Sequence, residues 1–203
     1  MGDHRGHIAV LQDDGHLTGA AVAALHAVSG VDTALLRAAK VRPSSANWLH
    51  APWYPYRRGG ALTIGRTIWF TGIWFSKHGL GDGSPSSTLR WLLHLAHEVG
   101  HLAQAERFGP SLWGKTRYVA AFAWQYATRA LLRRRPIHDG SPLEREADAG
   151  RRVLRAVVGD QQERHPLVAA VHGHAAPVVE RWCVQHRQYL AEIAGRVQAG
   201  NLA

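Results

Sequence analysis

The segment from about residue 84 to residue 108 is predicted to be one long helix that carries titratable side chains among apolar ones. Apolar residues recur at the spacing of a buried helix face, and a Gly-Pro pair at 109–110 predicts its end. His97, Glu98 and His101 lie inside this apolar stretch. A charged or titratable group in a buried helix needs a partner, because an unpaired one is costly to bury. Any fold of this chain must therefore bring a cation or polar groups to this helix.

The segment His97-Glu98-Val99-Gly100-His101 has the spacing of a zinc-binding pattern. Histidines four residues apart project from one helix face, so both imidazoles can reach one ion. Zinc binds such nitrogens at about 2.0–2.1 Å. In this pattern the glutamate takes a proton from a metal-bound water as that water attacks a carbonyl. We predict His97 and His101 as metal ligands and Glu98 as general base, with ordinary core hydrogen bonds as the alternative.

His94 lies three residues before His97 on the same predicted helix face. We interpret it as a surface histidine or a neighbour of the site in preference to an extra ligand.

A site with two histidines needs a third protein ligand. Glu144 and Asp148 are four residues apart in a predicted helix over 142–158, so they share a face, whereas Glu146 points elsewhere. We predict that Glu144 binds the metal and that Asp148 is hydrogen-bonded to a ligand imidazole. The alternative is a solvated helix start, where acidic side chains are favoured.

The other elements are expected from local signals. Residues 61–75, ALTIGRTIWFTGIWF, give the best strand signal, with a bulge or turn at Gly65-Arg66 or Thr71-Gly72. Asp32 is typical of a helix N-cap. We expect helices over 18–29, 32–42, 84–108, 111–134 and 142–158, two more broken near 172–174, and a structured loop over 43–60.

These elements predict an α+β fold that is mainly α, with a small antiparallel sheet packed on the long motif helix and further helices around it. The 203 residues suffice for one domain, 1–203, with a motif-bearing core over about 60–150 and helical extensions on both sides.

The paired motifs resemble those of known metallopeptidases. H-E-x-x-H at 97–101 followed by E-x-x-A-D at 144–148 looks like the gluzincin group. The segment from about 60 to 150 is more specifically similar to small bacterial zincin-like domains. Those domains share a strand of the type ALTIGRTIWF, an H-E-x-x-H-x-x-Q helix (here through Gln104) and an E-R-E-A-D segment. Some of them accompany phage-tail-like injection systems or toxins. The pairing is also similar to short metalloproteases that cleave transcriptional repressors.

The resemblance implies a zincin-like fold and a Zn²⁺ cofactor, with Glu144 as third ligand and Asp148 orienting a ligand histidine. It implies a metalloprotease acting on a protein or peptide, with Glu98 activating the metal-bound water. In such folds an edge strand above the motif helix binds the substrate backbone, and residues 67–75 are the candidate here. The alternative for their aromatic side chains is the hydrophobic core, which we favour for Trp69 and Phe70. The alternative is a non-catalytic zincin-like scaffold or effector domain associated with an injection or toxin system.

A peptide hydrolase also needs a donor for the developing oxyanion. Tyr118, Tyr126 and His138 lie between the two motifs and are the candidates. Their spacing does not choose among them, and packing or surface roles remain the alternatives.

Composition and charge narrow the remaining function classes. Cys183 is the single cysteine, so neither an intrachain disulfide nor a cysteine-based zinc cluster can form. The formal net charge of +9 favours acidic partners, but no helix-turn-helix or basic-aromatic array predicts specific nucleic-acid binding. The dense run Arg133-Arg134-Arg135 fits a helix C-terminus, with phosphate or membrane contact as the alternative.

Location follows from targeting signals. The N-terminus lacks the apolar core of a signal peptide, and no apolar run reaches the roughly 20 residues that span a bilayer. We expect a chain without a membrane span that is cytoplasmic, or exported without such a signal. The sequence leaves the oligomeric state open.

Overall fold

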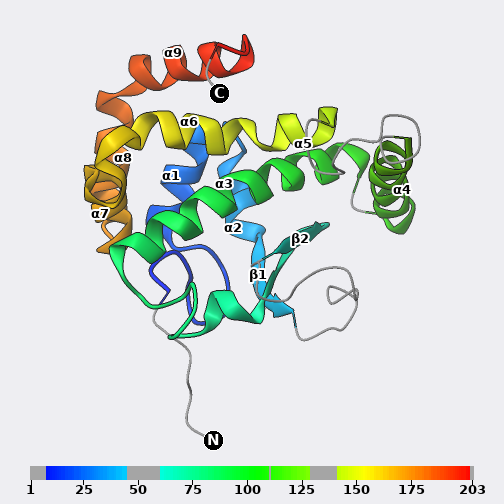
Figure 1. The fold of residues 1–203 in the computed structure, drawn as a ribbon, viewed down its shortest axis with the longest axis horizontal. Coiled ribbons are helices and arrows are strands. Elements are labelled where there is room, and N and C mark those ends of the chain that lie inside the picture. The colour runs from blue at the N-terminus through cyan, green and yellow to red at the C-terminus, as the bar shows by residue number, and fades with distance from the viewer. Residues whose placement is uncertain (1–7, 45–59, 110, 129–140, 202–203) are drawn as a thin grey trace, which may run out of the picture.

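The computed structural model describes residues 8–44, 60–109, 111–128 and 141–201, which are mainly helical with one small sheet (Figure 1). This confirms the expected α+β, mainly α class. The helices are α1 (Gly19–Ser29), α2 (Thr33–Ala38), α3 (Pro85–Phe108), α4 (Leu112–Thr128), α5 (Pro142–Ala147), α6 (Ala149–Val158), α7 (Pro166–His172), α8 (Ala176–Gln185) and α9 (Arg187–Gln198). The strands are β1 (Lys40–Ser44), β2 (Ala61–Ile64) and β3 (Thr67–Thr71), and 3₁₀ turns cover η2 (Gly72–Phe75) and η4 (Gly159–Arg164).

The motif helix α3 lies at the centre of the molecule. The Ser84 hydroxyl accepts a hydrogen bond from the Ser87 backbone N–H, and Pro85 occupies the first turn, as is typical of a helix start. The helix ends at Gly109, whose φ of 92° favours glycine. Helices α1, α4, α5, α6 and α7 and strand β2 all pack against α3. The helix that carries His97, Glu98 and His101 is therefore the element around which these other elements are arranged (Figure 1).

The sheet is mixed, which corrects the expected antiparallel sheet. Strands β2 and β3 form an antiparallel hairpin, and of the two expected turn positions it is Gly65-Arg66 that carries the turn, with Gly65 at a φ of 58°. Strand β1 pairs with β3 in parallel, so the strand order is β1-β3-β2. A parallel partner far away in sequence leaves no local signal, which explains the error.

Residues 40–44 form a strand, although the second helix was expected to continue to Arg42-Pro43. Helix α2 begins after its predicted N-cap, Asp32, but already ends at Ala38. Pro43 disfavours helical geometry in the residue before it, and Val41 is buried opposite Ile68. The loop expected over 43–60 and the end of the helix expected over 111–134 lie mostly outside the described residues.

An aromatic cluster joins the sheet to α3. The Phe70 ring of β3 lies 4.8 Å from the Trp91 ring of α3, and the Trp74 ring lies 5.0 Å from Trp91. All three side chains are almost fully buried, and each such pair adds about 0.5–1.5 kcal/mol beyond its area burial. This cluster sets the position of the sheet relative to the motif helix. It belongs to one hydrophobic core that extends from Val10 to Val197.

The helix expected over 142–158 is divided at Asp148 into α5 and α6. Both pieces run along α3 at close range (Figure 1). A Cβ added to Gly100 would lie 2.5 Å from Ala147 Cα, and one added to Gly150 would lie 2.9 Å from the Ala96 carbonyl oxygen. Only glycine lets the backbones approach so closely, so Gly100 within the motif brings α5 against it.

None of the helices in the described part combines the length and the apolar character needed to cross a bilayer.

Candidate metal centre

Three predicted ligands lie together where α3 meets α5. His97 Nε2 is 3.2 Å from His101 Nε2 and 3.4 Å from Glu144 Oε2, and His101 Nε2 is 3.7 Å from the same oxygen. Their donor atoms all lie within 4.8 Å of one another, in a group that could hold a metal ion. The sequence predicted that these three side chains come together, and the structure confirms it although Glu144 is more than 40 positions away from the histidines.

The donor set fits zinc in both chemistry and spacing. A tetrahedral ion with bonds of about 2.0–2.1 Å separates its donor atoms by about 3.3–3.4 Å. The three distances among His97, His101 and Glu144 are close to that value. Two imidazoles and one carboxylate form a ligand set that zinc accepts when one position is left for water or substrate.

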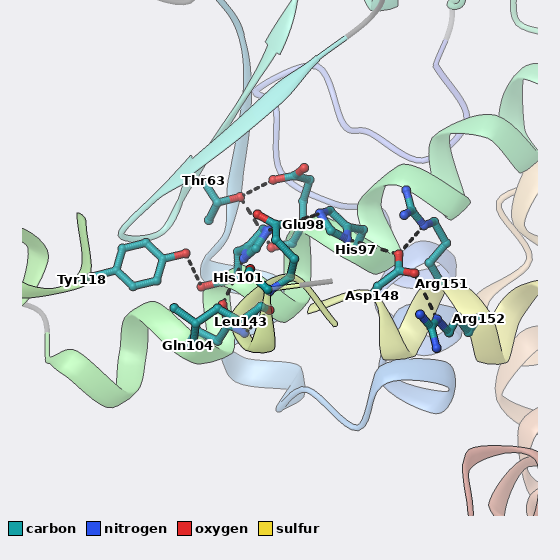
Figure 2. A network of polar contacts seen from close by, with 12 residues as sticks. Thr63, His97, Glu98, His101, Gln104, Tyr118, Leu143, Asp148, Arg151 and Arg152 are labelled. Carbon is teal, nitrogen blue, oxygen red and sulfur yellow. Dashed lines mark hydrogen bonds and ion pairs between the residues drawn. The ribbon is translucent and has the colours of Figure 1, made fainter. Parts of the chain in front are cut away.

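Gln104 fixes the orientation of His101. Its side-chain oxygen lies 3.0 Å from His101 Nδ1, so Nδ1–H donates and Nε2 keeps its lone pair toward the cluster. The Gln104 amide donates to the Leu143 carbonyl at 2.8 Å and to Glu146 Oε2 at 3.2 Å. One fully buried side chain therefore orients a ligand on α3 and anchors the residue before the ligand on α5 (Figure 2).

Asp148 contacts the other imidazole from the opposite side. Its Oδ1 lies 3.3 Å from His97 Nδ1, an ion pair whose angles are not those of an aligned hydrogen bond. Arg151 and Arg152 also pair with this carboxylate (Figure 2). Burial raises the pKa of Asp148, but His97 and Arg151 outweigh it and lower the pKa to about 2. Asp148 is therefore a permanent anion beside His97, at the place where an orienting carboxylate was predicted.

The surroundings of His97 favour its protonated form when no metal is bound. Burial lowers the pKa of His97, but contacts with Asp148 and Glu144 outweigh burial and raise it to about 9. At neutral pH a protonated His97 then pairs with both carboxylates, and a cation bound among the donors would replace that proton.

Glu98 is held from the sheet and takes no part in the ligand group. The Thr63 hydroxyl of β2 donates a 2.7 Å hydrogen bond to Glu98 Oε2, and both side chains are buried (Figure 2). Sequence analysis missed Thr63. It lies in the segment predicted as strand, but nothing local showed which strand residue would face the motif helix.

Of the three predicted oxyanion donors, Tyr118 is the one whose side chain lies within the described residues. Tyr118, on α4, is buried and its hydroxyl donates to the His101 carbonyl at 3.4 Å (Figure 2). Burial and the nearby charges of Glu98 and Glu144 raise the Tyr118 pKa, so the hydroxyl keeps its proton. The Tyr126 side chain and the whole of His138 lie outside the described residues.

Two further side chains near the motif lie outside the metal group. The His94 ring packs edge-on against Trp74 at 4.5 Å. Burial and the charge of Arg151 lower its pKa to about 4, so His94 is neutral. Glu146, expected to point away from the ligands, pairs with Arg107 at 2.6 Å.

The strand order changes which strand lies at the sheet edge. Residues 67–71 form β3, which is paired on both sides and cannot accept another strand. The edge strand over α3 is β2, which among the described residues is paired only with β3. The expectation of an edge strand at 67–75 is therefore wrong, and Ala61–Ile64 takes that place.

Comparisons of the chain with protein-family models, with curated proteins and with solved structures find no match.

Proposed function

We propose that this chain is a zinc metallopeptidase with a zincin-like site in which Glu98 is the general base. The observation that carries the proposal is the joint placement of His97, His101 and Glu144 with a buried Glu98 beside them. A purely structural ion pair would not need a second, separately anchored carboxylate at the same helix face.

Different residues of the chain have different roles in the proposed reaction. His97, His101 and Glu144 would hold Zn²⁺, which when bound lowers the pKa of a coordinated water and polarises a carbonyl. Glu98 accepts the proton of the attacking water, and Thr63 keeps the Glu98 carboxylate in one orientation. Tyr118 carries a protonated hydroxyl near this helix and is our candidate donor for the oxyanion.

A peptide substrate fits the sheet edge. Strand β2 carries Thr63 and runs beside α3. An extended peptide that paired with β2 would bring its backbone past Glu98, with main-chain hydrogen bonds providing affinity. The proposal therefore favours unfolded or extended protein segments as substrates.

Metal analysis and matched variants test the proposal. We expect about one zinc per purified chain, with zinc retained in Glu98→Gln and lost in His97→Ala. Hydrolysis of a peptide library should disappear in both, while exposed His78→Ala keeps zinc and activity. Absence of stoichiometric zinc from the wild-type protein contradicts the proposed cofactor. Zinc without hydrolysis, in the wild type as in Glu98→Gln, would instead support a scaffold that only binds metal.

A further inference from the structure

Within the part of the chain that the structure describes, helix α4 packs against α3 through the face that carries Tyr118 and Phe122. Its Tyr118 ring packs at 5.6 Å from Phe108, and its Phe122 ring packs at 5.2 Å from His101. These two aromatic residues lie against α3, and both contact His101 of the metal group. In Figure 1, α4 stands at the end of the molecule where α3 finishes, so its opposite face points outward.

The outward face of α4 is apolar and exposed. Trp113 is 70% exposed, Trp124 72% and Leu112 82%. Four of the seven large hydrophobic side chains that are exposed among the described residues belong to this helix. At 100° per residue they fall on one stripe together with exposed small residues. This outer stripe consists of Leu112, Trp113, Val119, Ala120, Ala123, Trp124 and Ala127, with the exposed polar residue Thr116 among them.

Basic residues border the outer stripe. Lys115 and Arg117 are exposed on its two flanks, and no acidic residue occurs in Leu112–Thr128. Exposed apolar patches of this kind mark interaction sites, and here the surrounding charge requires an anionic partner.

We propose that the outer stripe of α4 binds the surface of an anionic lipid bilayer. Tryptophan favours the level of lipid headgroups, and a helix with an apolar face and basic flanks lies in that interface. Each Lys or Arg near an anionic leaflet adds to the electrostatic attraction. A second copy of the chain fits poorly, because it would oppose two basic-bordered stripes that contain no acidic residue.

Membrane binding through α4 would also bring the metal group close to the bilayer surface. The inner face of α4 covers His101, so the metal group would lie about one helix diameter, about 10–12 Å, from the bilayer. On the proposed peptidase function, the substrates would be protein segments at a membrane surface. The binding experiment below does not depend on catalysis, so the two proposals fail separately.

The test is flotation of the whole protein with liposomes of phosphatidylcholine alone or with 30% phosphatidylglycerol. We expect the protein to bind the anionic liposomes at least tenfold more tightly than the neutral ones. Binding to the anionic liposomes should decrease as the salt concentration is raised. The double variant Trp113→Ser/Trp124→Ser should reduce binding at least tenfold. Lys115→Glu/Arg117→Glu should remove most of the preference for anionic lipid.

Matched controls lie on the far helices. Val184 is 75% exposed on α8, and Arg187 is exposed on α9, so Val184→Ser and Arg187→Glu should bind as the wild type does. All altered side chains are exposed, and circular dichroism should show folded protein in every case. The proposal is overturned if folded wild type does not float with anionic liposomes, or if Val184→Ser loses as much binding as the tryptophan variant. A dimer in solution that only the tryptophan variant dissociates, or binding to DNA without binding to liposomes, overturns it as well.

Discussion

Three side chains of the site are each contacted by a neighbour, which for Glu98 and His97 comes from another element and for His101 from α3 itself. Thr63 of β2 holds Glu98, Asp148 contacts His97, and Gln104 both orients His101 and anchors α5. Fixed orientation matters because a metal site or a general base works only within narrow geometric limits. On the proposed function, single substitutions can therefore separate metal binding from catalysis.

Thr63→Val should reduce turnover while leaving the metal in place. The substitution keeps the side-chain shape but removes the 2.7 Å hydrogen bond to Glu98 Oε2. Hydrogen bonds to charged groups contribute about 1.5–3 kcal/mol, so kcat should decrease about 10- to 100-fold. We expect unchanged KM and zinc content, and Thr63→Ser should restore most of the activity because it restores the hydroxyl. An equal loss in Thr63→Ser would contradict a positioning role for this hydroxyl.

Metal binding should release a proton from His97. The His97 pKa of about 9 lies above neutral pH, so the metal-free imidazole is protonated at pH 7.5 and must lose that proton to bind an ion. Zinc affinity should therefore increase with pH up to about 9. Calorimetry in buffers of different ionisation enthalpy should show about one proton released per zinc from this residue.

The same measurement on Asp148→Asn identifies the source of the proton. Without the carboxylate beside its Nδ1, His97 loses one of the contacts that raise its pKa, and proton release at pH 7.5 should decrease. Asp160→Asn, at an exposed position in η4, should release as many protons as the wild type. Equal release from all three proteins would show that another group supplies the proton.

Elements differed in how well the sequence predicted them. Helix α3 was predicted with nearly its observed start and with its end before Gly109, because periodicity and helix-stop residues are local signals. Strand β1 was missed, because its parallel pairing with β3 depends on residues more than 20 positions away. The role of Thr63 was missed for the same reason: the register of a strand over a helix is a property of the packed molecule.

Gly100→Ala should weaken metal binding although Gly100 is no ligand. The added Cβ would lie 2.5 Å from Ala147 Cα, so α5 must move away from α3 and take Glu144 with it. We expect zinc affinity to decrease at least tenfold, and overpacking of this kind destabilises by about 1–3 kcal/mol. Zinc titration and thermal unfolding measure the two effects.

Gly195→Ala is the matched control for this element. Gly195 lies in α9, and a Cβ added there meets nothing within 4 Å. Replacing an unstrained helical glycine by alanine stabilises by about 0.5–1 kcal/mol, so zinc affinity should be unchanged and the unfolding temperature slightly higher. Wild-type zinc affinity in Gly100→Ala would contradict the view that close packing of α5 sets the position of Glu144.

At the scale of the whole molecule, the metal group lies where the short helix α5 packs against α3. Helix α5 has only six residues, and it contacts α3 through polar bonds from Gln104 and Arg107, the buried Ala147 and the candidate ligand Glu144. Helices α1 and α6, in contrast, pack against α3 within the main hydrophobic core. A bound ion therefore stabilises the α3–α5 contact far more than the rest of the fold.

Removing zinc with EDTA should thus lower the unfolding temperature and loosen α5 selectively. A ligand at about 1,000 times its Kd stabilises by about 4 kcal/mol, which for a domain of this size corresponds to about 8–16 °C. Hydrogen exchange should show lost protection over residues 142–147 and little change over α1. The unfolding temperature of His97→Ala should no longer respond to EDTA, while that of His78→Ala should respond as the wild type does. If EDTA left unfolding unchanged, or loosened α1 as much as α5, the ion would not be the link between α3 and α5, because that link is local to the two elements that supply its ligands.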